Sequence, residues 1–254
     1  MSRWRWKLAG TLGVICVVWA TAAIAQEGFF SRRMRRSFVT NPNIPYDGKF
    51  TFVRLRHGLE GFGRGEPPWA HDYPRAERNF SRILQEITFV KPHLNDSNVF
   101  TLDDPELFAY PVAYVSEPGF WQMNDDELRG IQDYVRKGGF LIFDDFRDEH
   151  WYNFEEQMRR VVPDGHLVPL DTNHPVFHAF FDINTAETQG VYGTAQFHGM
   201  FEDNDPNKRL LLVANYNHDL GELWEFSDTG FVPVDLSNDA YKYGVNYIVY
   251  AMTH

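Results

Sequence analysis

Two adjacent carboxylates, Asp144 and Asp145, directly follow the apolar run FLIF, and Asp148 and His150 come a few residues later. Such groups at a strand end could hold a hard divalent cation, or His150 could act as a general base. In the structural alternative, Asp145 or Asp148 caps the next helix while Asp144 accepts hydrogen bonds from loop amides. Successive side chains of a strand point in opposite directions, so we expect at most one of the two aspartates to face a shared pocket. Asp144 and His150 are thus candidate catalytic residues.

A tight turn, Ser116-Glu117-Pro118-Gly119, follows the apolar run of residues 111–115. Glu117 is a third candidate catalytic residue, because its carboxylate would lie at the end of a strand. A hydroxyl nucleophile at Ser116 would need a positioned base and an oxyanion hole, and no G-x-S-x-G motif surrounds it. The favoured interpretation of Ser116 is therefore a turn hydroxyl that bonds its own backbone.

A strand, a helix and a second strand are predicted around these groups. Residues 111–115 and 140–143 have the length and apolar character of strands, and Asn124 with Glu127 has the spacing of a helical capping box. Gly138-Gly139 would end that helix, because glycine adopts the left-handed backbone conformation that helix C-termini need. This order of elements predicts a right-handed crossover and a parallel sheet.

Parallel strands bring the residues that follow them to one edge of the sheet, and ligands of such sheets bind there. Further strands are predicted at residues 50–55 and 210–214, and a loop at 69–75 should lie over the same edge. The mixture of charged, amide and aromatic groups suits a polar ligand with an apolar face, such as a sugar or a peptidoglycan fragment. We therefore expect a ligand-binding edge formed by Arg56, His57, Trp69, Asp72, Tyr73, Glu117, Asp144, Asp145, Asn215 and His218.

Histidine spacing gives no specific metal signature. The chain has ten histidines, and none occurs in an H-E-x-x-H or H-x-H pattern. His71-Asp72 resembles a histidine oriented by a carboxylate, although two adjacent side chains rarely touch. No organic cofactor is predicted, and a divalent metal of open identity is the one inorganic candidate.

The remaining pattern predicts a single α/β domain over residues 49–254. Residues 171–209 give no clear assignment. Alternating strands and helices predict a three-layer, doubly wound sandwich with a mostly parallel sheet. Its other expected elements are a helix after Pro74, a strand at 99–102, a helix at 149–162, a polar loop at 215–221 and a C-terminal helix capped by Ser237.

The first 25 residues have the features of a secretory signal peptide. A basic start precedes the apolar run of residues 8–24, and Ala23-Ile24-Ala25 is a small-x-small cleavage site. An uncleaved inner-membrane anchor at residues 8–24 is the alternative, although the run is short for a membrane span. We expect export to the periplasm or the exterior, with residues 26–48 as a flexible segment before the domain.

The charge and the cysteine count exclude several classes of function. Cleavage would remove three basic and no acidic residues, taking the formal net charge from −11 to about −14. Such a surface disfavours nucleic acid as a partner, and membrane contact is expected only through a retained signal segment. Cys16, the only cysteine, lies in that segment, so the mature chain has no thiol for a disulfide or a nucleophile.

Three segments carry a resemblance to a known family: WAHDYPRAE at residues 69–77, the strand-helix-GGFLIFDDF unit at 111–146, and NHPVFHAFFDI at 173–183. They resemble the bacterial family named domain of unknown function 4159, over most of the chain from about residue 49. That family is assigned to the class I glutamine amidotransferase-like superfamily, so the resemblance implies a flavodoxin-like fold and no established activity. True class I amidotransferases place a cysteine nucleophile on the turn after a central strand. The corresponding turn here, at Ser116, has none.

The missing thiol and the polar edge together predict a catalytically degenerate amidotransferase-like domain that binds a polar ligand or a protein partner in the cell envelope. The alternative is a metal-assisted or carboxylate-histidine hydrolase of envelope carbohydrate or peptide, with His150 or His71 as base and Asp144 as ligand or acid. Distances separate the two hypotheses. Three or more such groups within metal-ligand reach of one point favour the enzyme, whereas scattered groups bonded to backbone favour binding. The residues alone leave open whether the domain is an enzyme.

Overall fold

The computed structural model describes residues 38–58, 66–184 and 188–254. Residues 40–59 and 66–254 form a compact unit, to which all the elements below belong. The signal segment predicted at residues 1–25 lies outside the described residues, as does the 26–37 part of the segment predicted to be flexible.

The described residues build one seven-stranded sheet in the order β2-β1-β3-β4-β9-β8-β5. The first five strands in this order run parallel, and β8 and β5 pair antiparallel at one side. The prediction of an α/β protein with a mostly parallel sheet is therefore confirmed. The strands are β1 (Phe50–Arg56), β2 (Pro92–Thr101), β3 (Val112–Ser116), β4 (Phe140–Phe146), β5 (Val168–Pro169), β8 (Gln196–Phe201) and β9 (Leu210–Tyr216), with β6 (Gln189–Gly190) and β7 (Gly193–Thr194) as a separate hairpin.

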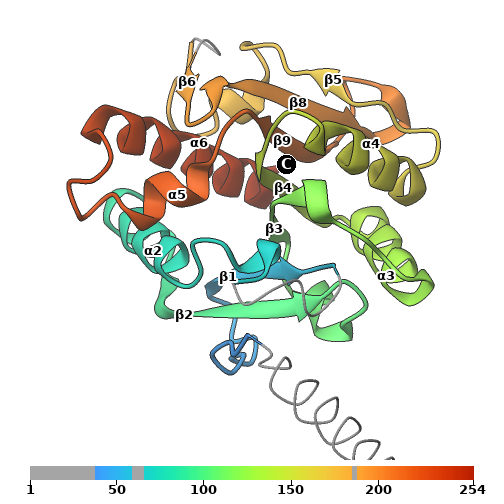
Figure 1. Ribbon diagram of the computed structural model, residues 1–254, viewed down its shortest axis with the longest axis horizontal. Helices are drawn as coiled ribbons and strands as arrows, with labels where there is room; N and C mark the ends of the chain where they lie inside the picture. Colours follow the sequence, from blue (N-terminus) through green and yellow to red (C-terminus); the bar gives the residue numbers. More distant parts are fainter. Residues whose placement is uncertain (1–37, 59–65, 185–187) are drawn as a thin grey trace, which may run out of the picture. The chain divides into compact units, whose positions relative to one another are not determined.

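Helices cover both faces of the sheet, with α2, α5 and α6 on one side and α3 and α4 on the other (Figure 1). The α-helices are α2 (Arg75–Ile87), α3 (Asp125–Arg136), α4 (His150–Val161), α5 (Leu220–Glu225) and α6 (Val234–Thr253). Short 3-10 helices are η1 (Pro68–Ala70), η2 (Pro105–Ala109), η3 (Pro118–Phe120), η4 (Pro175–Phe177) and η5 (Glu202–Asn204).

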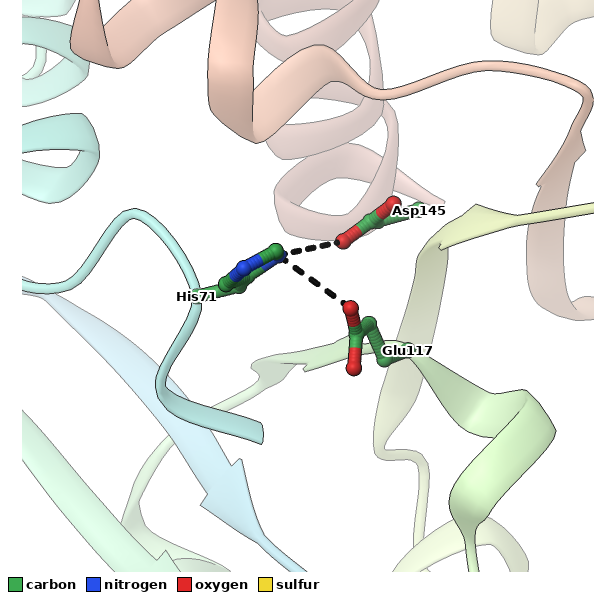
Figure 2. A group of neighbouring side chains, drawn as sticks. All are labelled: His71, Glu117 and Asp145. Atoms are coloured by element: carbon green, nitrogen blue, oxygen red, sulfur yellow. Dashed lines mark hydrogen bonds and ion pairs between the residues drawn. The ribbon is translucent and has the colours of Figure 1, made fainter. Parts of the chain in front are cut away.

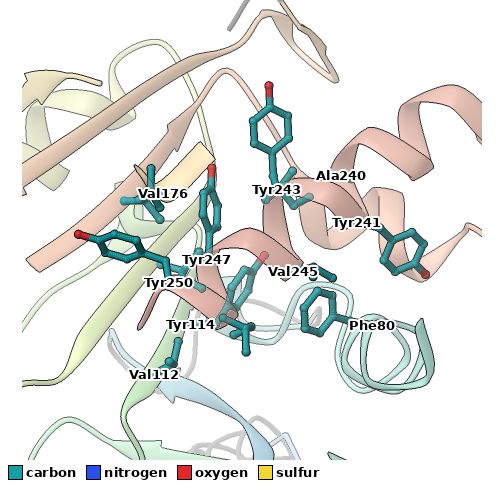
Figure 3. Close-up of a cluster of buried hydrophobic side chains, with 14 of the residues drawn as sticks. Phe80, Val112, Tyr114, Val176, Ala240, Tyr241, Tyr243, Val245, Tyr247 and Tyr250 are labelled. Atoms are coloured by element: carbon teal, nitrogen blue, oxygen red, sulfur yellow. The ribbon is translucent and has the colours of Figure 1, made fainter. Parts of the chain in front are cut away.

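Two hydrophobic clusters hold these helices to the sheet, one on each face. Strand alternation separates them, since Phe52 belongs to one cluster and the next residue, Val53, to the other. Figure 3 shows the aromatic-rich cluster under α2 and α6. Each fully buried aromatic side chain there stabilises the fold by roughly 2–3 kcal/mol relative to exposure. Gly244 lets α6 approach closely, because a Cβ atom at this position would lie 2.6 Å from both Phe80 and Trp224.

The central strand-helix-strand unit forms as its sequence predicts. The Asn124 side chain accepts hydrogen bonds from the Asp126 and Glu127 amides, and the Glu127 carboxylate accepts one from the Asn124 amide. Gly138 has a φ of 111°, the backbone conformation expected where this helix ends.

Three expected boundaries are corrected. Ser237 is not an N-cap, because α6 already begins at Val234 after Pro233, and the Ser237 amide donates to the Pro233 carbonyl. β2 begins at Pro92 instead of residue 99, since backbone pairing with β1 extends through the polar residues that precede the apolar ones. The loop expected at 215–221 contains the start of α5, whose N-cap is Asp219.

Part of the segment predicted to be flexible lies along the outer strand β2. The Ile44 amide donates to the Asn98 side chain, which returns a hydrogen bond to the Ile44 carbonyl. Asn43 exchanges hydrogen bonds with the Val99 backbone in the same way. The flexibility of the segment as a whole stays a prediction.

Within the three described ranges of the chain, no helix combines the length and the hydrophobicity that a membrane crossing requires.

The capping box of α3 can be tested directly. Replacing Asn124 with alanine should lower the free energy of unfolding by about 1 kcal/mol, because two helix N–H groups lose their acceptor. Urea denaturation measures this change. Glu127→Gln is the matched control, since an amide oxygen can still accept from the Asn124 amide, and its change should stay within about 0.5 kcal/mol. An unchanged midpoint for Asn124→Ala would contradict the assignment.

Candidate functional site

Four segments bring acidic and imidazole side chains to the carboxyl edge of the parallel strands. The β1-to-α2 connection supplies His71 and Asp72, Glu117 follows β3, Asp145 lies near the end of β4, and Asp219 follows β9. The convergence follows from the parallel arrangement, because consecutive parallel strands all end at the same edge.

His71, Glu117 and Asp145 form the first group of this edge (Figure 2). The Nδ1 atom of His71 lies 3.2 Å from Glu117 Oε1 and 3.2 Å from Asp145 Oδ2. The His71 side chain is 47% exposed, whereas that of Asp145 is 4% exposed, so the group opens to solvent on the imidazole side. One ligand atom from each residue lies within 4.8 Å of the other two.

Asp72, Asp145 and Asp219 form a second group that shares Asp145 with the first. All three side chains are buried, and one oxygen of each lies within 4.8 Å of the others. The Tyr192 hydroxyl lies between two of them, 2.9 Å from Asp145 Oδ1 and 3.2 Å from Asp219 Oδ2. The Asp219 Oδ1 atom accepts a hydrogen bond from the Glu222 amide and so caps α5.

A β-bulge at the end of β4 accompanies the placement of Asp145 in the cluster. The register between β4 and β9 shifts between Phe143 and Phe146, and Asp145 has a φ of 60°. A bulge redirects side chains that regular alternation would send to opposite faces. Asp145 joins both groups, whereas Asp144 belongs to neither and accepts hydrogen bonds from the amides that follow Asp219, in line with the expectation that at most one of the two aspartates faces a shared site.

Asp144 is a structural anchor of the edge. Its Oδ2 atom accepts hydrogen bonds from the Tyr114 hydroxyl at 2.7 Å and from the Leu220 and Gly221 amides at 2.7 and 3.0 Å. Its Oδ1 atom accepts from Asn215 Nδ2 at 3.1 Å. The side chain is fully buried, and burial raises its pKa to about 7 against these four donors. The structural alternative is confirmed for Asp144, which bonds backbone amides, here those of the first turn of α5. It is wrong for Asp145 and Asp148, because no side chain of the described residues caps the N-terminus of α4.

Arg54 fixes the loop that carries His71. Its guanidinium is fully buried, forms an ion pair with Glu77, and donates to the Trp69 and His71 carbonyls at 3.0 and 2.8 Å. A buried arginine whose donors point at backbone carbonyls holds a loop in one conformation, because releasing it would leave a charge unpaired in the interior.

Three of the clustered carboxylates have left-handed backbone conformations, with φ values of 66° at Asp72, 47° at Glu117 and 60° at Asp145. Aspartate tolerates this region, but glutamate does so at a cost of roughly 1–2 kcal/mol. Such strain gathers at functional sites, where the surrounding structure holds it in place.

Burial and mutual repulsion raise the pKa values of these carboxyl groups. Burial and the charge of Asp145 raise the pKa of Glu117 to about 7, and burial raises that of Asp72 to about 8 against the opposing charge of Arg54. Burial likewise raises the pKa of Asp219 well above its usual value. The hydrogen bond to Asp145 raises the pKa of His71 to about 9, so an imidazolium is the local counter-charge near neutral pH.

Several predicted contributors lie outside the cluster. The Nε2–H group of His57 donates to the Ser116 carbonyl at 2.7 Å, and the Ser116 side chain is fully buried. The ring of His150 packs against Phe120 with 4.8 Å between centroids. The other positions are structural or peripheral: Arg56 ends β1, the Trp69 carbonyl accepts from Arg54, the Tyr73 hydroxyl accepts from the Asn41 amide, Asn215 bonds Asp144, and His218 Nδ1 accepts from the Asp219 amide.

Two members of the site were not predicted, Asp219 and Tyr192. Asp219 and Glu222 have the spacing of a capping box, so a local signal for Asp219 was present. Tyr192 lies between two strands of two residues each, which give no periodicity. Its position depends on a contact across the fold.

A hollow of about 240 Å³ lies between the start of α4 and the ends of β8 and β9. Its aromatic side chains make a wall: Trp151 packs against Tyr216 with ring centroids 5.3 Å apart. The lining residues are Asp148, Trp151, Tyr152, Gln196, His198 and Tyr216.

The geometry of both groups fits the coordination sphere of a divalent cation. Ligand atoms that bind one ion at roughly 2.0–2.4 Å can be at most about 4.8 Å apart, which is the spread within each group. Carboxylates with one imidazole suit manganese, zinc or iron as well as magnesium. The fold and this edge define an α/β protein with a carboxylate-rich candidate metal centre.

The chain belongs to the family described as Domain of unknown function (DUF4159), whose sequence model matches residues 51–252. The match covers every residue of the cluster and all of the sheet and helices except the first residue of β1 and the last of α6. No curated protein matches the chain.

The role of Asp144 predicts a large loss of stability on amidation. Asp144→Asn would place an NH₂ group against hydrogen-bond donors that now point at a carboxylate oxygen. This should lower the free energy of unfolding by about 3 kcal/mol. Tyr114→Phe removes one of the four donors and should cost about 1 kcal/mol. Chemical denaturation in the presence of EDTA measures both changes without any contribution from metal ions. Equal effects of the two substitutions would show that Asp144 is not an anchor.

Burial of His57 predicts an acid-sensitive contribution to stability. Burial lowers its pKa to about 4, below the ordinary value of 6.5. Between these values the unfolded chain binds more protons, so stability falls as the pH falls from about 6.5 to about 4, by up to about 3 kcal/mol. His57→Gln removes this contribution, so the difference in unfolding free energy between protein and variant should shrink over that range. A difference independent of pH would contradict the buried neutral imidazole.

Proposed function

We propose that this protein is an exported, catalytically degenerate amidotransferase-like domain that binds a divalent cation through His71, Glu117 and Asp145. The observation that carries the proposal is the convergence of these three side chains, from three separate segments, on one point within 4.8 Å. By the distance criterion set out from the sequence, this convergence favours the metal-assisted enzyme, whereas the absence of a cysteine at the turn after β3 supports the catalytically degenerate domain.

Electrostatics supports the same proposal. Four carboxylates, at positions 72, 117, 145 and 219, form two groups that share Asp145, and only one imidazole, that of His71, belongs to them. Burying like charges is costly unless a counter-ion compensates them. A divalent cation would compensate two of the charges and would replace the proton on His71 as the partner of Asp145.

The finer fold and the location belong to the proposal too. Helices on both faces of a mostly parallel sheet support a three-layer, flavodoxin-like arrangement of the class I amidotransferase-like superfamily. The basic start and apolar run of residues 1–25 support export. A bound cation with an open coordination position would suit a polar envelope ligand.

Metal-assisted hydrolysis of envelope carbohydrate or peptide is the second candidate, and the position of Glu117 favours it. Glu117 occupies the strained turn after a central strand, where amidotransferases hold their nucleophile, and its carboxylate points at the cation site. Release of amino or reducing groups from peptidoglycan fragments, dependent on added metal and lost in Asp145→Asn, would establish this activity. Metal binding without turnover would leave the degenerate binding domain.

Thermal unfolding with defined ions tests the cation site. The full chain, stripped with EDTA, is melted alone and with added Mg²⁺, Ca²⁺, Mn²⁺ or Zn²⁺. At 100 times the dissociation constant, binding should add about 2.7 kcal/mol and raise Tm by roughly 5–10 °C. Glu117→Gln should reduce the shift, and Asp145→Asn should abolish it.

Asp148→Asn is the matched control, because it removes the same charge from an exposed side chain near the same edge. Asparagine also tolerates the left-handed backbone of residue 148. This variant should keep the full shift. The proposal fails if no ion gives a saturable shift, or if Asp145→Asn responds as the unaltered protein does.

A further inference from the structure

We infer that the edge holds a second cation position, formed by Asp72, Asp145 and Asp219, with Asp145 as the ligand shared by both ions. This inference rests on the proposed function and extends it from one ion to two. Paired divalent ions roughly 3.5–4 Å apart are typical of sites that activate water or bind phosphate and carboxylate groups.

The two oxygens of Asp145 point to different groups, as a bridging carboxylate requires. Oδ2 lies 3.2 Å from His71 Nδ1, in the first group. Oδ1 lies 2.9 Å from the Tyr192 hydroxyl, which also contacts Asp219 Oδ2. Each oxygen thus faces a separate set of candidate ligands.

Asp72 supplies an independent observation. Its side chain is 7% exposed, and among the described residues its Oδ2 atom has no hydrogen-bond partner. An unpaired buried carboxylate oxygen is costly, and native proteins rarely leave one without a partner. Asp72 also offers an oxygen within 4.8 Å of Asp145 and Asp219, so its carboxylate is placed to bind an ion there.

Among the described residues, no basic side chain donates a hydrogen bond to Asp72 or Asp219. In the described part of the chain, the hydrogen bonds of Arg54 go to Glu77 and to two backbone carbonyls. The Tyr192 hydroxyl has one proton for two acceptors. Tyr192 can therefore donate to Asp145 or to Asp219 but not to both at once, and a divalent cation would supply the partner that this group of carboxylates lacks.

Binding stoichiometry with Mn²⁺ tests the inference on the full chain. Calorimetric titration should give about two Mn²⁺ per chain, with electron paramagnetic resonance signals of a magnetically coupled pair. Asp72→Asn should reduce the stoichiometry to about one and remove the coupling, since the position formed by His71, Glu117 and Asp145 is kept. Asp148→Asn should still bind about two ions.

Asp72→Asn should fold, because asparagine tolerates the left-handed backbone of residue 72. The replaced oxygen, Oδ2, also makes no hydrogen bond with the described residues that the substitution would remove. Chemical unfolding in EDTA checks that the variant folds. If the variant does not fold, the signal of the coupled Mn²⁺ pair in the unaltered protein still tests the inference. A single Mn²⁺ per chain would overturn the second position while leaving the proposed function intact. No binding would overturn both. Binding of two ions by Asp72→Asn would also overturn the second position.

Discussion

The carboxylate of Asp144 is the interaction on which the carboxyl edge depends. It joins β3 through Tyr114, β9 through Asn215, and the first turn of α5 through two backbone amides. A fully buried charge with four donors is stable only while all of them stay in place, so these elements are fixed as one unit. The helix α5 has six residues, too few to be stable alone, and depends on this anchor and on its cap.

The anchor also positions the residues of the candidate metal centre. Asp145 is the next residue along β4, and Asp219 directly precedes the amides that Asp144 binds. Arg54 positions the loop that carries His71, because its guanidinium donates a hydrogen bond to the His71 carbonyl. The residues of the candidate metal centre are therefore supported by a surrounding set of buried hydrogen bonds. Sites built in this way keep their geometry because each supporting group has its own partner.

Local signals predicted the architecture well, and contacts across the fold account for what they missed. The capping-box spacing of Asn124 and Glu127 correctly predicts the start of their helix. The rule that parallel strands end at one edge correctly predicts that Glu117 and Asp145 lie close together. The bulge at Asp145 could not be anticipated, because the alternation argument assumes a regular strand. Tyr192 could not be found either, since its short hairpin has no periodic pattern and its role comes entirely from two distant carboxylates.

Stability alone does not explain the left-handed glutamate at position 117. Glycine or asparagine would adopt a φ of 47° more easily, and burial beside other carboxylates adds a second cost to the same residue. Both costs fall on a side chain whose carboxylate reaches His71 at 3.2 Å. A residue that is unfavourable in backbone and in charge, yet held in contact with its neighbours by a rigid frame, is best explained by a ligand that compensates both. A divalent cation would do so, because its charge offsets the repulsion and its coordination uses the direction that the strained turn imposes.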